Sequence, residues 1–227
     1  MGCTVNDLVD RLRRLDSCAV SDARDRLGLP DTVVTSVKNL VNLGRVAGLV
    51  TTVRLGPVTG QLATRHLCTS AVENSDSLNV IVVDHQGRSD CAGWGGNLSR
   101  AAGQRAVAGT LVFGAARDID EARDIGYAVY ATTSTPRTAR GRTQEHAWNE
   151  PITFDGIKVA PGDFVIADST GIVFIPASEI ESVVATAEMI AATEADMARA
   201  IAQGTPVGTV MGGAYERLID QGQEEET

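Results

Sequence analysis

The sequence predicts an α/β protein with a mostly parallel central sheet, helices covering that sheet and a small antiparallel layer. Apolar, β-branched runs alternate with helical runs between residues 45 and 135, and strands in such strand-helix-strand units pair in parallel. One run, "NVIVVD" (79–84), is continuously apolar, as buried parallel strands are. From 151 to 176 the pattern changes to short apolar strands separated by Asp-Gly, Pro-Gly and Thr-Gly, which indicate antiparallel hairpins.

Two short helices are expected at the start of the chain. The first has leucines at helical spacing, and the second follows Ser17, which we expect to cap it, and ends at Gly28. The alternating, β-branched run 45–55 predicts the first long strand. The run "QLATRHLCTSAVE" (61–73) predicts a helix between this strand and the strand at 79–84.

The second half of the parallel unit is expected after a polar loop that follows Asp84. Its elements come in order as a helix at 95–106, a strand at 109–114, a helix at 118–126 and a strand at 127–135. A long helix is expected over 177–203, ending at Gly204, because its apolar residues form one stripe (Ile180, Val184, Ala187 and Ala191).

Composition and charge narrow the class of protein. Hydrophobic residues make up 43% of the 227 residues and charged residues 22%, so we expect one globular domain over 1–220 and a disordered acidic tail over 221–227. The formal net charge of −9 would repel phosphate backbones, so nucleic acid is not an expected partner. The four cysteines form no metal or disulfide motif, and no run suits a secretory signal or a membrane span. These features predict a cytoplasmic protein with reduced thiols.

The stretch "ARDIDEARDIG" (116–126) contains two Arg-Asp pairs. Arg117-Asp118 follows the strand at 109–114, and ligands of open α/β sheets bind at the carboxyl ends of strands. The alternative role for Asp118 is to cap the next helix. Arg123-Asp124 lies six residues further on and therefore faces about 240° away, which favours a solvated surface with Asp120 as a charge partner.

A glycine-rich helix start accompanies the first pair. "GWGGNL" (93–98) brings two glycines, Gly95 and Gly96, before Asn97 and Leu98, and the free amides of a first helical turn favour a carboxylate there. Together with a guanidinium and a potential metal ligand on the neighbouring strand, this arrangement suits chemistry on a 2-oxo acid. The spacing is neither of the two glycine-rich phosphate-binding signatures, so nucleotide binding is disfavoured.

On these motifs the sequence resembles the RraA-like family, which includes class II 4-hydroxy-4-methyl-2-oxoglutarate and 4-carboxy-4-hydroxy-2-oxoadipate aldolases and the regulator of ribonuclease E activity. The resemblance runs through most of the chain and includes the stretches "SCAVSDARDRLGLP", "GRVAGLVTTVR", "GWGGNLSRAA", "VAGTLVFGAARDIDEARDIGYAVYA", "STPRTARGR" and "VAPGDFVIADSTGIVFIP". It implies an α/β/β sandwich of the phosphohistidine-swivelling type. It also implies homotrimers, or homohexamers of two trimers, with active sites at subunit interfaces.

The resemblance also implies roles for individual residues. Asp118 would be the direct ligand of Mg²⁺ or Mn²⁺, Arg117 would contact the 2-oxo oxygen of pyruvate, and the amides around Asn97 and Leu98, after Gly95, would hold its carboxylate. One position departs from the family. The aldolases usually have an acidic residue that supports the metal's water where this chain has Gly96, and Asp84, Asp90 or Glu145 are alternatives for that acid.

Further polar residues are candidates for the distal part of a site. The loop "TPRTARGR" carries three arginines, of which Arg140 and Arg142 are expected to bind a distal carboxylate; the alternative is a solvated or intersubunit charge. His66, on the predicted helix, is expected to pack, and His85 has the better position at a strand end. Glu145 is a candidate general base or water holder, and Trp94 a packing anchor.

These observations predict a metal-dependent lyase that cleaves a 4-hydroxy-2-oxo acid by retro-aldol reaction and releases pyruvate. Oxaloacetate decarboxylation passes through the same enolate, so the same site is suited to both reactions. The alternative is a non-catalytic, protein-binding regulator that resembles the ribonuclease E inhibitor, for which an acidic surface is suited.

Overall fold

The computed structural model of the chain describes residues 4–60 and 65–212. Its centre is a mixed sheet in the order β1-β11-β10-β3-β4-β5-β6-β2, with β7 paired to β3. The parallel strands are β3 (Val46–Gly56), β4 (Asn79–Trp94), β5 (Gly109–Ala116) and β6 (Val129–Ser134). The antiparallel strands are β1 (Val33–Val34), β2 (Lys38–Asn39), β7 (Gln144–Trp148), β10 (Phe164–Ala167) and β11 (Ile172–Ile175).

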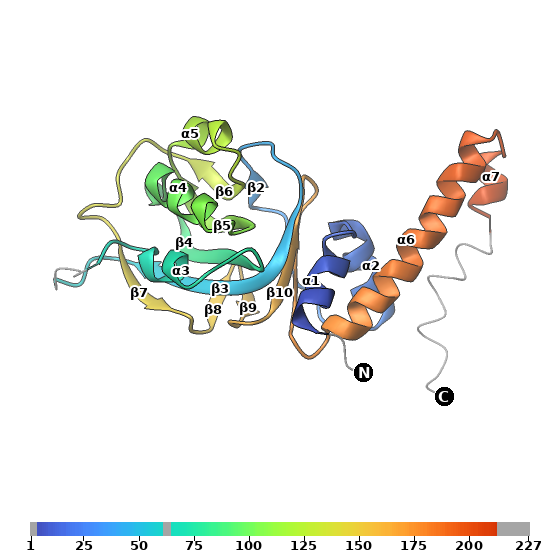
Figure 1. Cartoon of the computed structure of the whole chain (residues 1–227), viewed down its shortest axis with the longest axis horizontal. Coiled ribbons are helices and arrows are strands. Elements are labelled where there is room, and N and C mark those ends of the chain that lie inside the picture. The colour runs from blue at the N-terminus through green and yellow to red at the C-terminus, as the bar shows by residue number, and fades with distance from the viewer. Residues whose placement is uncertain (1–3, 61–64, 213–227) are drawn as a thin grey trace.

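Helices cover one face of this sheet in two groups, which Figure 1 shows on either side of β10. Over β3 to β6 lie α3 (Thr69–Glu73), α4 (Gly96–Gln104) and α5 (Ile119–Asp124). Over β3, β10 and β11 lie α1 (Val5–Leu12), α2 (Ser17–Arg26) and α6 (Ile180–Ala202), and the short α7 (Val207–Val210) follows α6. The opposite face is covered by the separate hairpin of β8 (Ile152–Phe154) and β9 (Ile157–Val159). The layers confirm the predicted α/β/β sandwich.

Successive side chains of a strand point alternately into the two hydrophobic layers of the protein. In β3, Ala47 and Val53 pack toward the helices, whereas Val46 and Val50 pack toward β8 and β9. Side chains of a strand point to opposite faces in turn, so a strand covered on both faces must be apolar throughout. This is why the core of β4 was recognisable in the sequence as the continuous apolar run 79–84.

Several expected elements have different boundaries. The helix predicted over 61–73 is helical only from Thr69, and residues 61–64 lie outside the described residues. The polar loop predicted after Asp84 is wrong, because β4 continues to Trp94 through register shifts against β5. The polar side chains after Asp84 thus belong to an irregular continuation of β4 and do not mark the end of the strand.

The N-terminal cap and the antiparallel layer also need correction. Asp16, and not Ser17, caps α2 by accepting a hydrogen bond from the Ala19 amide, while Ser17 donates to Asp168. Of the strands predicted in 151–176, only β8 and β9 form a separate layer, because β10 and β11 join the main sheet.

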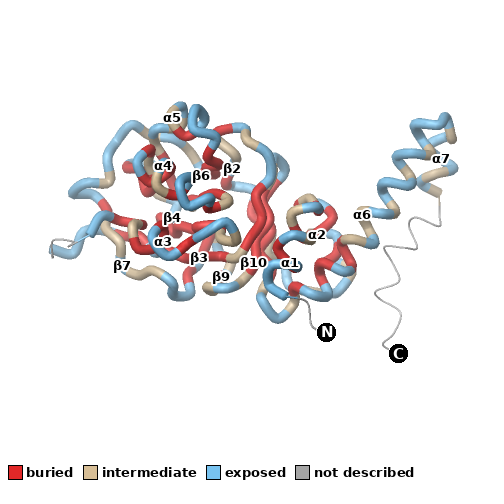
Figure 2. Tube along the Cα trace, in the orientation of Figure 1, coloured by how far each residue is buried: buried red, intermediate tan, exposed pale blue. Residues whose placement is uncertain are grey.

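The long helix α6 extends past the body of the protein, and Figure 2 shows its second half without buried residues. Its last buried residue is Ala187, and the exposed large side chains beyond it include Met189 and Ile201. No helix in the described part of the chain is both long and apolar enough to span a membrane. The tail 221–227 lies outside the described residues, so its predicted disorder stays a prediction.

A close approach between β3 and the segment before β4 makes a prediction about stability. A Cβ added to Gly48 would overlap the backbone carbonyl oxygen of Leu78, and that carbonyl already accepts a hydrogen bond from the Leu49 amide at 2.7 Å. We expect Gly48→Ala to lower the free energy of unfolding by about 1–3 kcal/mol, because backbone must move to admit the methyl group. Urea denaturation measures this. Gly44→Ala is the control, since a Cβ there meets nothing within 4 Å, and an equal loss in both variants would contradict the packing argument.

Candidate active site

The ends of β4 and β5 bring the two predicted motifs together. Trp94 pairs with Ala116 in the parallel ladder, and the Arg117 amide donates a 3.0 Å hydrogen bond to the Trp94 carbonyl. The glycine-rich start of α4 and the Arg117-Asp118 pair therefore lie side by side at the carboxyl ends of neighbouring parallel strands. Ligands bind at this edge in open α/β sheets.

Asp118 does not act as the helix cap that was the alternative reading of its position. It precedes α5 with a left-handed backbone (φ 58°), a conformation that Asp adopts more readily than most residues, and its side chain makes no capping hydrogen bond. Instead, Asp118 Oδ2 accepts a 2.9 Å hydrogen bond from the Gly96 amide and lies 3.2 Å from Arg117 Nε. The carboxylate is thus directed toward the glycine-rich turn.

The second Arg-Asp pair lies on the surface, as predicted. Arg123 forms an ion pair with Asp120 at 2.5 Å and donates to the Leu40 carbonyl at 3.3 Å. Both Arg123 and Asp124 are exposed on α5. The six-residue spacing therefore separates a pair directed into a pocket from a pair directed into solvent.

The first pair opens onto a small cavity of about 80 Å³, which we call the cradle. Its lining includes Gly95, Gly96, Asn97, Leu98, Arg117 and Asp118, together with His66, Leu67, Ala92, Gly93, Trp94, Thr138 and Ala139. Among the described residues, the backbone N–H groups of Asn97 and Leu98 have no acceptor, as is usual in the first turn of a helix. Two free amides and a guanidinium therefore face one small space, which suits an anion.

Trp94 is the packing anchor that the sequence suggested. It is 2% exposed, its ring stacks on Tyr127 with centroids 6.4 Å apart, and its Nε1 donates to Ser99 Oγ at 2.9 Å. Because Ser99 lies in the first turns of α4, this contact holds the start of the helix against the end of β4.

Glu121 lies directly against Gly96, an arrangement that sequence reasoning missed. A Cβ built on Gly96 would overlap Glu121 Oε2 and lie 3.0 Å from Oε1, so this carboxylate occupies the space that a side chain at position 96 would need. Glu121 also forms an ion pair with Arg100 of α4. Its position three residues after Asp118, on the same side of a helical turn, was the available signal.

A second cavity of about 460 Å³, the outer chamber, adjoins the cradle. Its lining includes the cations Arg65, Arg117 and Arg140, as well as His66 and Glu145. Arg142 lines neither cavity, because its Nη1 donates back to the Thr138 carbonyl at 3.3 Å. Of the two arginines expected to meet a distal carboxylate, the structure brings Arg140 to the chamber and directs Arg142 to its own loop.

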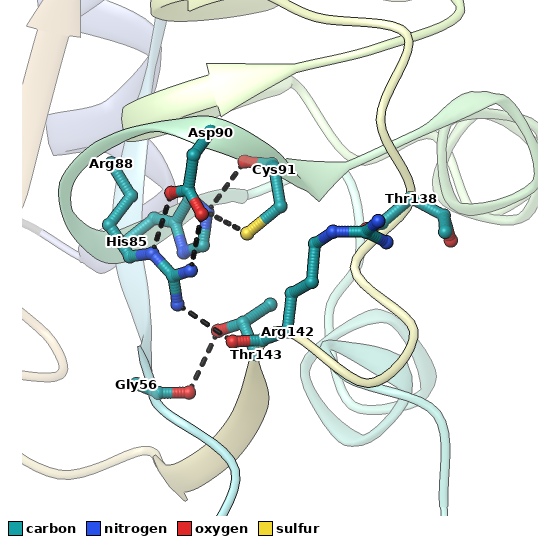
Figure 3. A network of polar contacts seen from close by, with 8 residues as sticks. All are labelled: Gly56, His85, Arg88, Asp90, Cys91, Thr138, Arg142 and Thr143. Atoms are coloured by element: carbon teal, nitrogen blue, oxygen red, sulfur yellow. Dashed lines mark hydrogen bonds and ion pairs between the residues drawn. The ribbon is translucent and has the colours of Figure 1, made fainter.

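The arginine loop is held by a polar network, shown in Figure 3. Arg88 forms a two-point ion pair with Asp90 at 2.9 and 2.7 Å and donates from Nη1 to the Arg142 carbonyl at 2.8 Å. Thr143 Oγ1 donates to the Gly56 carbonyl at 2.9 Å. The irregular part of β4 thus fixes the loop that carries Arg140.

The two histidines have exchanged the roles that their sequence positions suggested. His85 is fully buried, its Nε2 lies 2.9 Å from the Cys91 carbonyl, and burial lowers its pKa. His66, expected to pack on a helix, lies in the turn before α3 and lines both cavities. Because His85 is buried and His66 lines both cavities, His66 and not His85 is accessible to a ligand.

Glu145 lies in the outer chamber and braces the neighbouring turn. Its Oε2 accepts a 2.6 Å hydrogen bond from the Cys68 amide. Burial raises the pKa of Glu145, and the Cys68 amide opposes this by stabilising the charged form. Burial also raises the pKa of the Cys68 thiol well above its usual value, which favours the neutral thiol over the thiolate.

The other acids considered for Gly96 lie elsewhere. Asp84 accepts a hydrogen bond from the Gln86 amide, and Asp90 is paired with Arg88. Neither lines the cradle or the outer chamber. Glu121 is thus the carboxylate nearest to the place where a side chain at position 96 would lie.

The protein is thus an α/β/β sandwich with a pocket at the carboxyl ends of two parallel strands, lined by Arg117, Asp118 and the glycine-rich start of α4. The chain belongs to the RraA-like family: the family's sequence pattern, described as Aldolase/RraA, matches residues 17–174. This range contains β4, β5 and both motifs of the pocket. The family assignment confirms the resemblance drawn from the sequence.

Similar proteins support the assignment. Protein DlpA of Legionella pneumophila is 29% identical over 89% of this chain, which spans about a third (33%) of that relative's length. A 4-hydroxy-4-methyl-2-oxoglutarate aldolase of Thermus thermophilus is 30% identical over 61% of this chain and 80% of its own. The structure resembles that of a Pseudomonas syringae protein (TM-score 0.83, 28% identity, 93% of this chain and 100% of that one). It also resembles Streptomyces coelicolor RraAS2, described as an unusual member of the RNase ES inhibitor RraA family (TM-score 0.77, 26% identity, 85% and 96%).

Proposed function

We propose that the protein is a divalent-metal-dependent lyase that cleaves a 4-hydroxy-2-oxo acid by retro-aldol reaction and releases pyruvate. The observation that carries this proposal is the orientation of Asp118. Its carboxylate does not cap α5. Instead it accepts a hydrogen bond from the Gly96 amide and pairs with Arg117 in a cavity that the Asn97 and Leu98 backbones also line. A guanidinium, a carboxylate and free amides are the groups needed to bind a 2-oxo acid and stabilise its enolate.

The donors present suit a hard cation such as Mg²⁺ or Mn²⁺. Asp118 and Glu121 both place carboxylate oxygens next to Gly96, and Mg²⁺ is commonly bound by one or two carboxylates together with water. The described residues contain no cluster of three or more His, Cys, Asp or Glu that would form an all-protein cage. A divalent cation held by Asp118 would act as a Lewis acid on the oxygens of the 2-oxo acid.

The protein's own groups divide the remaining work. The Asn97 and Leu98 amides bind the carboxylate of the pyruvate half, and the Arg117 guanidinium donates to the 2-oxo oxygen and stabilises the negative charge that develops on it. Arg140 in the outer chamber binds a distal carboxylate of the substrate. Decarboxylation of oxaloacetate would use the same enolate-stabilising groups.

Exchange of the pyruvate methyl protons in D₂O, followed by NMR, tests the proposal without knowledge of the full substrate. We expect exchange that depends on added Mg²⁺ or Mn²⁺. Titration with Mn²⁺, followed by its electron paramagnetic resonance signal, measures metal binding independently of turnover. Absence of both exchange and Mn²⁺ binding would contradict the proposal.

Glu121 is proposed to take the part of the family's acid at position 96. We expect Glu121→Gln to weaken Mn²⁺ binding about 10–100-fold, the usual effect of losing a supporting carboxylate. The double variant Gly96→Asp with Glu121→Ala should recover most of the affinity, because it removes the overlap and returns a carboxylate to the same place. Unchanged Mn²⁺ affinity in Glu121→Gln would rule out this role.

A second candidate function is a non-catalytic regulator that binds a protein. It is favoured by the likeness to RraAS2 and by the net charge of −9, which would attract a basic segment. The same titration separates the two functions, because a pure binding module has no need for Mn²⁺.

We also propose that the protein forms a homotrimer or a homohexamer with sites completed at the interfaces. Exposed apolar side chains on the projecting part of α6, on α7 and directly after it support self-association, among them Ile201, Val207 and Met211. Size-exclusion chromatography with light scattering measures the mass. A monomer at micromolar concentration would exclude this assembly.

A further inference from the structure

The cradle and the outer chamber meet at a shared wall. Six residues line both cavities: His66, Leu67, Asn97, Arg117, Thr138 and Ala139. If the pyruvate half of a substrate occupies the cradle and the remainder occupies the outer chamber, the bond between the two halves crosses this wall. Residues of the wall therefore face the atoms that react.

Two of the six wall residues carry ionisable side chains, His66 and Arg117. A guanidinium remains protonated in proteins and cannot accept a proton from the substrate. Imidazole both accepts and donates protons near neutral pH. Of the side chains on the shared wall, His66 is thus the one suited to proton transfer.

Hydrogen bonding leaves one nitrogen of His66 available. Its Nδ1 lies 3.0 Å from the Leu67 carbonyl oxygen, which can only accept, so in the neutral ring the proton resides on Nδ1 and Nε2 carries the lone pair. No partner is found for Nε2 in the described part of the chain. The ring therefore offers a base that already has the required tautomer.

Two hydrogen bonds hold the backbone at and just after His66. Thr69 Oγ1 donates to the His66 carbonyl at 2.7 Å, and Glu145 accepts from the Cys68 amide at 2.6 Å. Cys68 is fully buried and its Sγ contacts the Gly93 carbonyl at 3.8 Å, next to the cradle. Exposed though it is, His66 belongs to a turn anchored against the site, and Glu145 is a positioning residue for that turn.

We propose that His66 is the proton-transfer residue of the reaction, a role that rests on the proposed function. Nε2 takes the proton of the C4 hydroxyl, the C3–C4 bond breaks, and its electron pair forms the enolate of pyruvate while C4 becomes a carbonyl carbon. The imidazolium then returns the proton to C3, which yields pyruvate and regenerates the neutral ring. One residue at the wall serves both steps, because C3 and the C4 oxygen are two bonds apart.

The test uses the full chain and pyruvate as the probe. We expect His66→Gln to lower the rate of methyl proton exchange in D₂O about 100-fold, a usual contribution of a general base. Pyruvate binding, measured by isothermal titration calorimetry with Mn²⁺ present, should change less than about threefold, because binding uses the amides and Arg117. His146→Gln is the matched control, since His146 is exposed, contacts the Pro57 carbonyl and lines neither cavity.

Chemical rescue distinguishes a proton-transfer role from a structural one. In His66→Ala, added imidazole should restore exchange in proportion to its concentration, and an equal concentration of sodium chloride should not. An exchange rate in His66→Gln within about fivefold of the wild-type rate would overturn the assignment. A loss of exchange in His66→Ala that imidazole does not restore would overturn it as well. Exchange in the wild type with no effect of His66 substitution refutes only this role, whereas a wild type that neither exchanges nor binds Mn²⁺ overturns the proposed function and this role with it.

Discussion

Replacing Asp118 by Asn is expected to reduce metal-dependent exchange of the pyruvate methyl protons by about 1,000-fold, the scale of losing a principal electrostatic group in an active site. The carboxylate charge is lost, while the amide keeps the size of the side chain. Asn also adopts the left-handed backbone that Asp118 has (φ 58°), so the fold should be retained. Circular dichroism and the midpoint of urea unfolding check the fold, and Mn²⁺ titration checks the metal site.

The second Arg-Asp pair provides the control for this substitution. Asp124→Asn makes the same chemical change six residues later, on the exposed face of α5. It should leave exchange and Mn²⁺ binding unchanged. Normal exchange in Asp118→Asn, or equal losses in both variants, would contradict the assignment of Asp118 as the metal ligand.

Replacing Arg117 by Lys is expected to lower the exchange rate about 100-fold, with Mn²⁺ binding retained. Arg117 lines both cavities and its Nε lies 3.2 Å from Asp118 Oδ2, so the Nε edge of its guanidinium pairs with Asp118 beside the space proposed for the ligand. A Lys ammonium keeps the charge but cannot bind two groups in this plane. The loss of exchange rate in Arg117→Lys therefore measures the contribution of the planar guanidinium geometry, because the positive charge is retained.

Arg123→Lys is the matched control for Arg117→Lys. Arg123 pairs with Asp120 on the surface of α5 and lines neither cavity. Its replacement should leave exchange within about twofold of the wild-type rate, as surface substitutions usually do. Exchange at the wild-type rate in Arg117→Lys would show that a second positive charge at the enolate suffices without the planar geometry.

The parallel half of the fold and the place of the site were predictable from local patterns. Strands β3 to β6 are apolar because both of their faces are covered, and a run of this kind is visible in the sequence without any partner. Arg117-Asp118 and the glycine-rich turn each follow such a strand, so their meeting at one edge of the sheet follows from topology alone. The six-residue repeat then separates the two Arg-Asp pairs by helix geometry.

The chemistry of individual side chains was less predictable, because the same residue type suits several roles. Asp118 is a good helix cap by sequence, and only its contact with the Gly96 amide, 22 residues away, shows that it does not cap. Arg140 and Arg142 are equivalent in the sequence, yet the loop turns one toward the chamber and the other onto itself. His66 and His85 were ranked by position in the chain, and burial reversed that ranking.

The α/β class, the parallel strands β3 to β6 and the two motifs that meet at the site could be derived from the sequence, since hydrophobic periodicity and strand ends are local properties. The membership of β10 and β11 in the main sheet could not, because it depends on pairing with β3. Which polar groups line the two cavities follows only from the packing of the folded chain. The Glu121 carboxylate lies against Gly96 and His66 lies on the wall between two cavities because segments distant in the chain pack together. No local pattern encodes those contacts, because each depends on the relative placement of strands, helices and loops in three dimensions.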